Sequence, residues 1–141
     1  MVPSPVFNVG HSVVQIWMIF RLVPPRKDVS FPATDFFLPY VQRFEIVPQY
    51  RNLTMPSPRG PYPDPVTNMY VMKRSIRAGG SRMGDIIPLT NLRAAADLIP
   101  HWNEKADKHL TKETSVEYSR HFYLNKFFDK DMFYALDNPP Q

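Results

Sequence analysis

The sequence predicts a single, mainly β domain: a small, strongly curved sheet or SH3-like barrel with short helices towards the C-terminal end. Three observations favour it. The 141-residue chain holds 16 Pro and only 5 Gly, and Pro at this density breaks long helices. Its strongest apolar runs alternate with period two, as strands do. Its hydrophobic content of 43% is that of a chain with a packed core. An α+β sheet covered on one face is the alternative.

The first expected strand covers residues 12–23. Apolar, β-branched and aromatic side chains fill nearly all of its positions, and Gln15 and Arg21 interrupt them. Because both faces of the run are apolar, we expect burial on both sides of the strand. The second expected strand covers residues 36–47, where Pro39 indicates an edge position or a bulge near the start.

Residues 48–68 form a Pro-rich segment that predicts a long, extended surface loop. Within it, residues 58–61 read Pro-Arg-Gly-Pro, which fits the PxxP pattern of SH3 or WW ligands. A plain loop is the favoured interpretation of the two. The loop and a C-terminal tail at residues 137–141 are the only interruptions that we expect in a single domain of residues 1–141.

Residues 69–89 predict a hairpin with Gly79-Gly80 as its two-residue turn, because Gly supplies the positive φ of tight primed turns. That register sets Ile76 opposite Met83, Met72 opposite Ile87 and Arg74 opposite Asp85. It also sets Arg77 opposite Arg82. Such a like-charge pair favours an anion between the two side chains or a solvent-exposed tip.

The C-terminal half predicts short helices. Asn91 could cap a helix over residues 92–96, Thr114 and Glu117 have the spacing of a capping box, and residues 129–136 could form a last turn or two. The dense aromatic run over residues 118–134 is more typical of a segment that covers a core than of a stacking platform. The residues that we expect to be largely buried are Trp17, Phe20, Phe44, Ile46 and Ile87.

No constellation predicts catalysis, and we expect no enzyme activity and no cofactor. The chain has no Cys, which excludes disulfides, thiolate metal sites and a Cys nucleophile. Neither a nucleophile elbow nor a phosphate-binding glycine loop is present. His101 and Glu104 would share a helix face and could ligate a metal, but their charged neighbourhood is more typical of a solvated loop. We therefore predict no metal site and no small-molecule substrate.

The best binding signal is the basic hairpin. No acidic residue occurs between Val71 and Gly84, and with Arg74 directed at Asp85 the cations left for a nucleic acid are Lys73, Arg77 and Arg82. A two-stranded ribbon fits the major groove of DNA and can hold phosphates. An ordinary solvated hairpin tip is the alternative. The net charge of +4 is too small to decide between them.

Several segments, in this order, also match a known family: residues 10–15, 19–21, 37–44, 69–74, 84–89, 97–100, 110–111, 115–119, 122–127 and 129–130. Together they resemble the C-terminal region of Plavaka transposases of basidiomycete fungi, which are KDZ-like and related to CACTA elements. The resemblance covers about residues 9–136. Where that family has Asp-Gly in the hairpin turn, this chain has Gly79-Gly80.

The resemblance implies an accessory role without chemistry. The family's RNase H-like core, with its metal-binding acids, lies upstream of the region matched, so no catalytic residue carries over. The resemblance therefore implies a non-catalytic C-terminal module that binds DNA or other transposase domains, and a chain that is a terminal fragment or a degenerate reading frame. A stand-alone enzyme, or a fragment of one, with an unrecognised site is the alternative.

Neither a membrane span nor a secretory signal is expected. The longest apolar run falls short of the ~20 residues that a bilayer requires, and no basic-then-apolar segment opens the chain. We expect an intracellular protein, nuclear or cytoplasmic, with no membrane partner.

Overall fold

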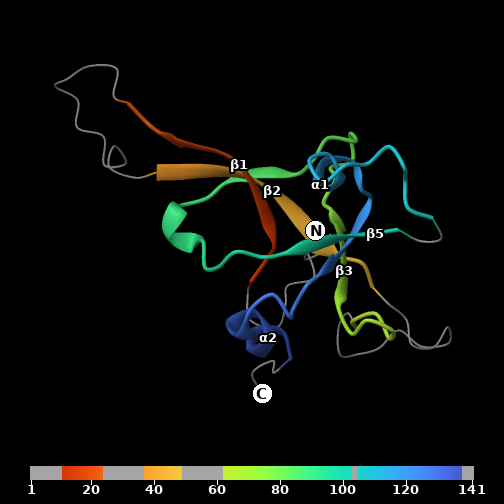
Figure 1. Ribbon diagram of the computed structural model, residues 1–141. Helices are drawn as coiled ribbons and strands as arrows, with labels where there is room; N and C mark the ends of the chain where they lie inside the picture. The colour runs from red at the N-terminus through yellow and green to blue at the C-terminus, as the bar shows by residue number, and fades with distance from the viewer. Residues whose placement is uncertain (1–10, 24–36, 49–61, 103–104, 138–141) are drawn as a thin grey trace. The chain divides into compact units, whose positions relative to one another are not determined.

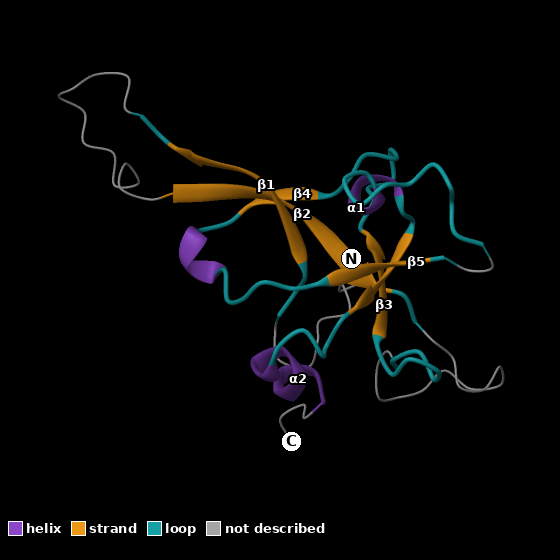
Figure 2. Ribbon diagram, in the orientation of Figure 1, coloured by secondary structure: helices purple, strands orange, loops and turns teal. Residues whose placement is uncertain are grey.

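The computed structural model describes residues 11–23, 37–48, 62–102 and 105–137. In these ranges the chain forms antiparallel β-strands with a few short helices, so the predicted mainly β class with short C-terminal helices is confirmed (Figures 1 and 2). The chain divides into two compact units. The first unit is Met1–Val13, Phe44–Arg74 and Ala96–Gln141, and the second is Val14–Arg43 and Ser75–Ala95. The one-domain organisation stays a prediction.

An antiparallel sheet forms the centre of the first unit. It contains, in spatial order, the end of β2 (Phe37–Ile46), β3 (Tyr70–Arg74), β6 (His121–Leu124) and β5 (Leu98–His101). The register places Met72 between Ile46 and Phe122 on the neighbouring strands. Because residues directly opposite each other share a face, this register gathers the large apolar side chains on one side of the sheet.

That side of the sheet carries the hydrophobic core. Phe44 and Phe122 meet edge to face, with 5.6 Å between the ring centroids. The buried cluster consists of Val13, Phe44, Ile46, Met72, Phe122 and Leu124, with Tyr70, Leu98 and Leu136 packed against it. The expected burial of Phe44 and Ile46 is therefore confirmed.

Two α-helices belong to the first unit. The helix α1 (Ser115–Tyr118) begins after Thr114, as expected. The Thr114 hydroxyl makes no capping bond to the helix, because Thr114 Oγ1 accepts the Thr111 N–H at 2.9 Å instead. The helix α2 (Lys130–Asp137) follows Asp129, whose Oδ1 accepts the Met132 N–H at 2.7 Å and caps the first turn.

The second unit is a three-stranded antiparallel sheet in the order β1 (Val14–Arg21), β2, β4 (Gly84–Ile86). The expected edge position at Pro39 is wrong, because the first part of β2 lies between β1 and β4. Pro39 faces Ile19 of β1, and its carbonyl accepts the Ile87 N–H at 3.2 Å. The irregularity lies in β1, at Trp17.

Strand β1 exists as expected, but its expected burial on both faces is wrong. Trp17 is 47% exposed, whereas Phe20 and Ile87 are half-buried. The alternation of apolar residues correctly predicts extended backbone. Burial on both faces would need a further layer on each side, and the described residues of the second unit provide none.

The tip of the hairpin differs from the predicted register by one residue. The Arg77 N–H binds the Ser81 carbonyl at 2.8 Å, and Ile76 bridges Arg82. The loop is therefore residues 78–80, with Gly80 at φ +82°, which is the three-residue type with a left-handed last residue. The predicted pairing of Arg77 with Arg82 is wrong.

Beyond the tip the predicted hairpin is wrong as well, because its two strands part. Arg74 faces Phe44, and Asp85 faces Val41. The turn residues cannot reveal that β3 and β4 separate, because the separation arises from pairing of both strands with the distant strand β2. The helix expected at residues 92–96 is also wrong, because these residues are not helical. A 3-10 turn, η1 (Leu89–Asn91), lies just before them. The PxxP residues 58–61 and Glu104 lie outside the described residues.

Candidate interaction surface

Lys73, the first of the three predicted nucleic-acid contacts, lies in the first unit. Its Nζ is 3.0 Å from Glu45 Oε1 on the neighbouring strand β2, and both side chains are partly exposed. A surface ion pair of this kind contributes roughly 0–1 kcal/mol. Lys73 is therefore partly neutralised and belongs to a different unit from the other two cations.

Arg77 and Arg82 both lie in the second unit, on the hairpin. Arg77 is exposed, and its guanidinium donates to the Gly84 carbonyl at 3.1 Å. Arg82 donates to Gln42 Oε1 at 3.4 Å, and its guanidinium carbon lies 5.8 Å from the centre of the Trp17 ring. The two arginines are thus held by neighbouring groups, one at the tip of the hairpin and one against β1.

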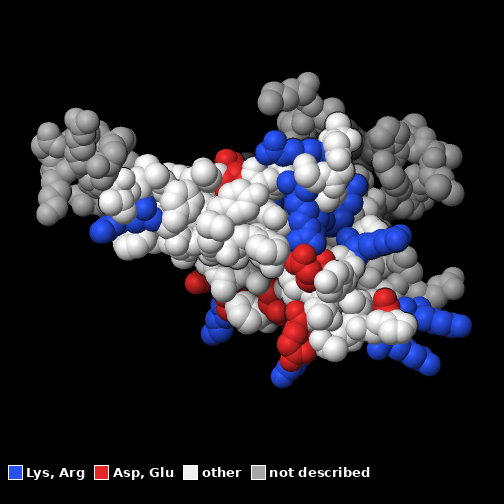
Figure 3. Space-filling view, turned by 90° about the horizontal axis from the view of Figure 1, so that it is seen from above, with Lys and Arg blue, Asp and Glu red and all other residues white. Residues whose placement is uncertain are grey.

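Acidic groups occur beside these cations. Arg43 and Asp85 form an ion pair at 2.6 Å, and the hydrogen bond from Arg43 is the main cause that lowers the pKa of Asp85. Figure 3 shows Lys and Arg side chains on the same face as Asp and Glu side chains. Because the charge of Arg77 also acts on Asp85, this carboxylate offsets part of the positive charge at the hairpin and weakens the single-sign field that draws proteins to nucleic acids without sequence preference.

The second unit also exposes a row of large apolar side chains on β1. This β1 surface consists of Ile16, Trp17, Met18 and Ile19, which are between 45% and 58% exposed. Ile16 lies opposite Val41 and Met18 opposite Tyr40, which are consecutive residues of β2, so the exposure affects both faces of the sheet. Isolated exposed apolar residues are ordinary, but four in succession make β1 a candidate interaction surface.

Strand β1 has a backbone edge as well as exposed side chains. It pairs with β2 and with no other strand in the part of the chain that the structure describes. Its residues 14–20 carry no charge and no Pro, the devices by which proteins usually protect an edge. In the sequence, the only sign of this exposed strand is that residues 12–23 lack a polar face. We interpreted that lack as burial of the strand within the chain.

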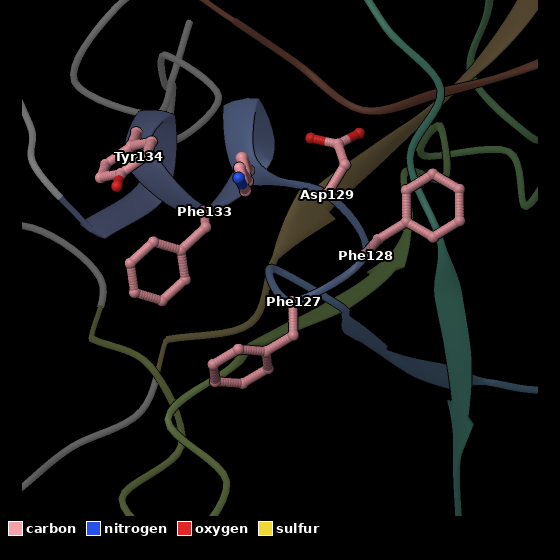
Figure 4. A pocket seen from close by; sticks show the side chains of 6 residues that line it. Phe127, Phe128, Asp129, Phe133 and Tyr134 are labelled. Carbon is pink, nitrogen blue, oxygen red and sulfur yellow. The ribbon is translucent and has the colours of Figure 1, made fainter.

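A hollow lies in the first unit, around the start of α2 (Figure 4). Its volume is about 450 Å³, and Phe127, Phe128, Asp129, Lys130, Phe133 and Tyr134 line it. The rings of Phe127 and Phe133 lie 5.9 Å apart, and Phe128 points away from them. Asp129 caps α2, so the hollow offers stacking surface but no evident nucleophile or base.

Neither a metal-ligand cluster nor a membrane-spanning helix occurs among the described residues. Among them no group of three or more His, Asp or Glu is placed to hold a metal ion. No helix in these ranges combines the length and the apolarity of a membrane span.

Comparison with known proteins gives one match. Residues 3–60 match the model of a family described as a domain of unknown function, DUF6830. This region includes β1 and β2. No curated protein and no solved structure matches the chain significantly.

Proposed function

We propose that this chain is a non-catalytic binding module, and that its β1 surface docks an extended strand of another protein. The observation that carries the proposal is the exposure of Ile16, Trp17, Met18 and Ile19 on a strand whose outer edge meets no described strand. A strand added there gains backbone hydrogen bonds and covers apolar side chains in one step, the mode known as β-augmentation.

The gain from covering the β1 surface is substantial. Burying a whole large apolar side chain contributes roughly 1.5–3 kcal/mol, so four half-exposed ones contribute roughly 3–6 kcal/mol before the cost of association. The free-energy cost of association is comparable to this gain, so backbone hydrogen bonds and charge interactions must supply the net affinity. The arrangement is suited to a reversible contact.

The charges define the partner further. Residues 14–20 are uncharged, so the facing positions of the partner strand are apolar or neutral. The Arg82 guanidinium lies over Trp17, at the side of this strand. A carboxylate next to the partner's apolar run would meet this guanidinium, and charge-assisted hydrogen bonds of that type are strong. The sequence resemblance suggests other domains of a transposase-like protein as its source.

The test uses two labelled peptides with the same alternating Val-Thr core, one flanked by Glu and one by Lys. Binding is followed by fluorescence anisotropy and by the emission of Trp17 in a Trp102→Phe background. We expect saturable binding that prefers the Glu-flanked peptide, and a loss of roughly tenfold or more in affinity for Met18→Lys. Val66→Lys is the control, because Val66 is 89% exposed in the other unit. Equal binding by Met18→Lys and the parent contradicts the proposal.

DNA contact through Arg77 and Arg82 is the second candidate, favoured by the exposure of Arg77 and the contact of Arg82 with Trp17. Two phosphate contacts give a slope of log affinity against log salt of about −1.8. Replacing Arg77 and Arg82 by Ala should reduce this slope by about two. A chain that does not bind duplex DNA at low salt excludes this candidate.

A further inference from the structure

A straight row of titratable side chains crosses the sheet of the first unit on the face away from the core. The register places Glu45 of β2 opposite Lys73 of β3, Lys73 opposite His121 of β6, and His121 opposite His101 of β5. Four neighbouring strands thus each contribute one ionisable group at the same level. The strands alternate these groups with core residues such as Phe122.

The two imidazoles at the end of the row lie close together. Their ring centroids are 6.4 Å apart, and the His101 ring also meets the Tyr123 ring edge to face at 4.5 Å. His101 Nδ1 is buried and has no hydrogen-bond partner among the described residues. A protonated imidazole has two N–H donors, so charging His101 would leave a buried donor without an acceptor.

The surroundings of the pair are predominantly basic. Burial is the main cause that lowers the pKa of His121, and the charges of His101, Lys73 and Arg120 lower it further. On the opposing side, Glu45 is engaged by Lys73. Asp64 lies near His101, but its carboxylate is held chiefly by the Thr67 N–H at 2.8 Å. Since Lys73 stands beside the only two imidazoles in the row, a divalent cation is disfavoured here.

The strand that carries His101 lies at an edge of the described sheet. β5 has four residues and pairs only with β6 in the described ranges. Pro100 lies within it and has no N–H to donate to the ladder. Beyond the ladder, the Asn125 backbone N–H and side-chain amide bind Asp97, at 3.0 Å to its carbonyl and 2.9 Å to its carboxylate.

We propose that the His101–His121 pair is an acid-sensitive latch, and that its protonation releases β5 from β6. In the neutral state the two rings pack against each other, and the His101 ring also packs against Tyr123. Charging them places two cations side by side in a row that already contains Lys73. The edge of β6 then becomes available for pairing with another strand. Because burial favours the neutral form of His121 in the folded chain, the stabilisation is complete above pH about 6.5 and is lost as the pH falls.

Hydrogen exchange of the whole chain, read by mass spectrometry between pH 7.5 and 5.5, tests this proposal. After correction for the intrinsic pH dependence of exchange, we expect the opening of residues 97–102 to increase roughly tenfold or more, and that of residues 70–74 to change much less. His121→Gln and His101→Gln should remove most of this increase. His109→Gln should leave it intact, because the His109 side chain is 96% exposed.

Two results overturn the proposal: opening of residues 97–102 that does not depend on pH, or the same pH dependence in His109→Gln and His121→Gln. If a Gln variant fails to fold, titration of the imidazole protons by NMR in the unaltered protein decides the question. The imidazole signals of His121 should titrate together with the amide signals of β5. Titration without a change in β5 overturns the latch.

Discussion

The core of the first unit makes a quantitative prediction for Phe44→Ala. Phe44 is 5% exposed, its ring meets Phe122 edge to face, and the Arg74 guanidinium carbon lies 4.9 Å from its centroid. Emptying a buried aromatic site costs about 3–5 kcal/mol. The loss of the aromatic pair, about 0.5–1.5 kcal/mol, and of the cation–π contact keeps this variant above the lower end of that range. We expect a loss of about 4 kcal/mol.

Urea denaturation followed by circular dichroism measures this loss. With a slope of about 2 kcal/mol per molar urea, the midpoint should fall by about 2 M. Phe37→Ala is the matched control, because Phe37 lies on the same strand and is 51% exposed. Its cost should stay below about 1 kcal/mol. If Phe44→Ala does not fold, Phe44→Leu gives a smaller loss in the same direction. A cost for Phe44→Ala below about 1 kcal/mol, or equal to that of Phe37→Ala, would refute the assigned face of β2.

Three further predictions concern Gly80, Gly84 and Asp64. Gly80→Ala should cost about 1–2 kcal/mol because Gly80 has φ +82°, whereas Gly79→Ala, at a residue without positive φ, should be close to neutral in the same urea assay. Gly84→Ala should destabilise the chain because the new Cβ meets the Tyr40 ring, and the cost should shrink in a Tyr40→Ala background when the four proteins are compared as a double-mutant cycle. The hydrogen bond from the Thr67 N–H is the main cause that lowers the pKa of Asp64, so the Asp64 carboxylate stabilises the fold above pH about 4 and loses this effect as the pH falls. Asp64→Asn should therefore flatten the acid side of a curve of stability against pH. An unchanged acid side would contradict this prediction.

The sequence was a good guide to local backbone preference. The alternation of apolar residues located β1 and β2, and the spacing of Thr114 and Glu117 indicated where α1 starts, although the Thr114 hydroxyl makes no capping bond. These features depend on a few neighbouring residues, so they can be recognised without the tertiary structure.

Pairing and burial were less accessible, because they depend on segments far apart in the chain. Arg74 and Asp85 have complementary charges and were predicted to face each other across a hairpin. Both of their strands pair with β2 instead, where Arg74 faces Phe44 and Asp85 faces Val41. Arg74 lies against α1, where its guanidinium donates to the Val116 carbonyl at 2.5 Å, and Asp85 binds Arg43. Likewise, an apolar strand indicates that something covers it, but not whether the cover belongs to the same chain.

In the candidate site too, local features could be predicted from the sequence, whereas features that depend on distant segments could not. The cations of the hairpin were visible in the sequence, and their use as nucleic-acid ligands stays a prediction. The β1 surface and the His101–His121 pair were not identified. The first requires solvent exposure, and the second requires the register between two strands that lie twenty residues apart.

The chain passes between its two units four times, after Val13, Arg43, Arg74 and Ala95. No single cut of the gene can therefore separate one unit from the other. The family match over residues 3–60 contains both halves of β2 but not β3, the strand against which Phe44 and Ile46 pair. A relative that kept only the matched region would need a substitute for β3 to close the core. We expect evolution to have transmitted this region together with such a strand, and not as a cassette that can be moved on its own.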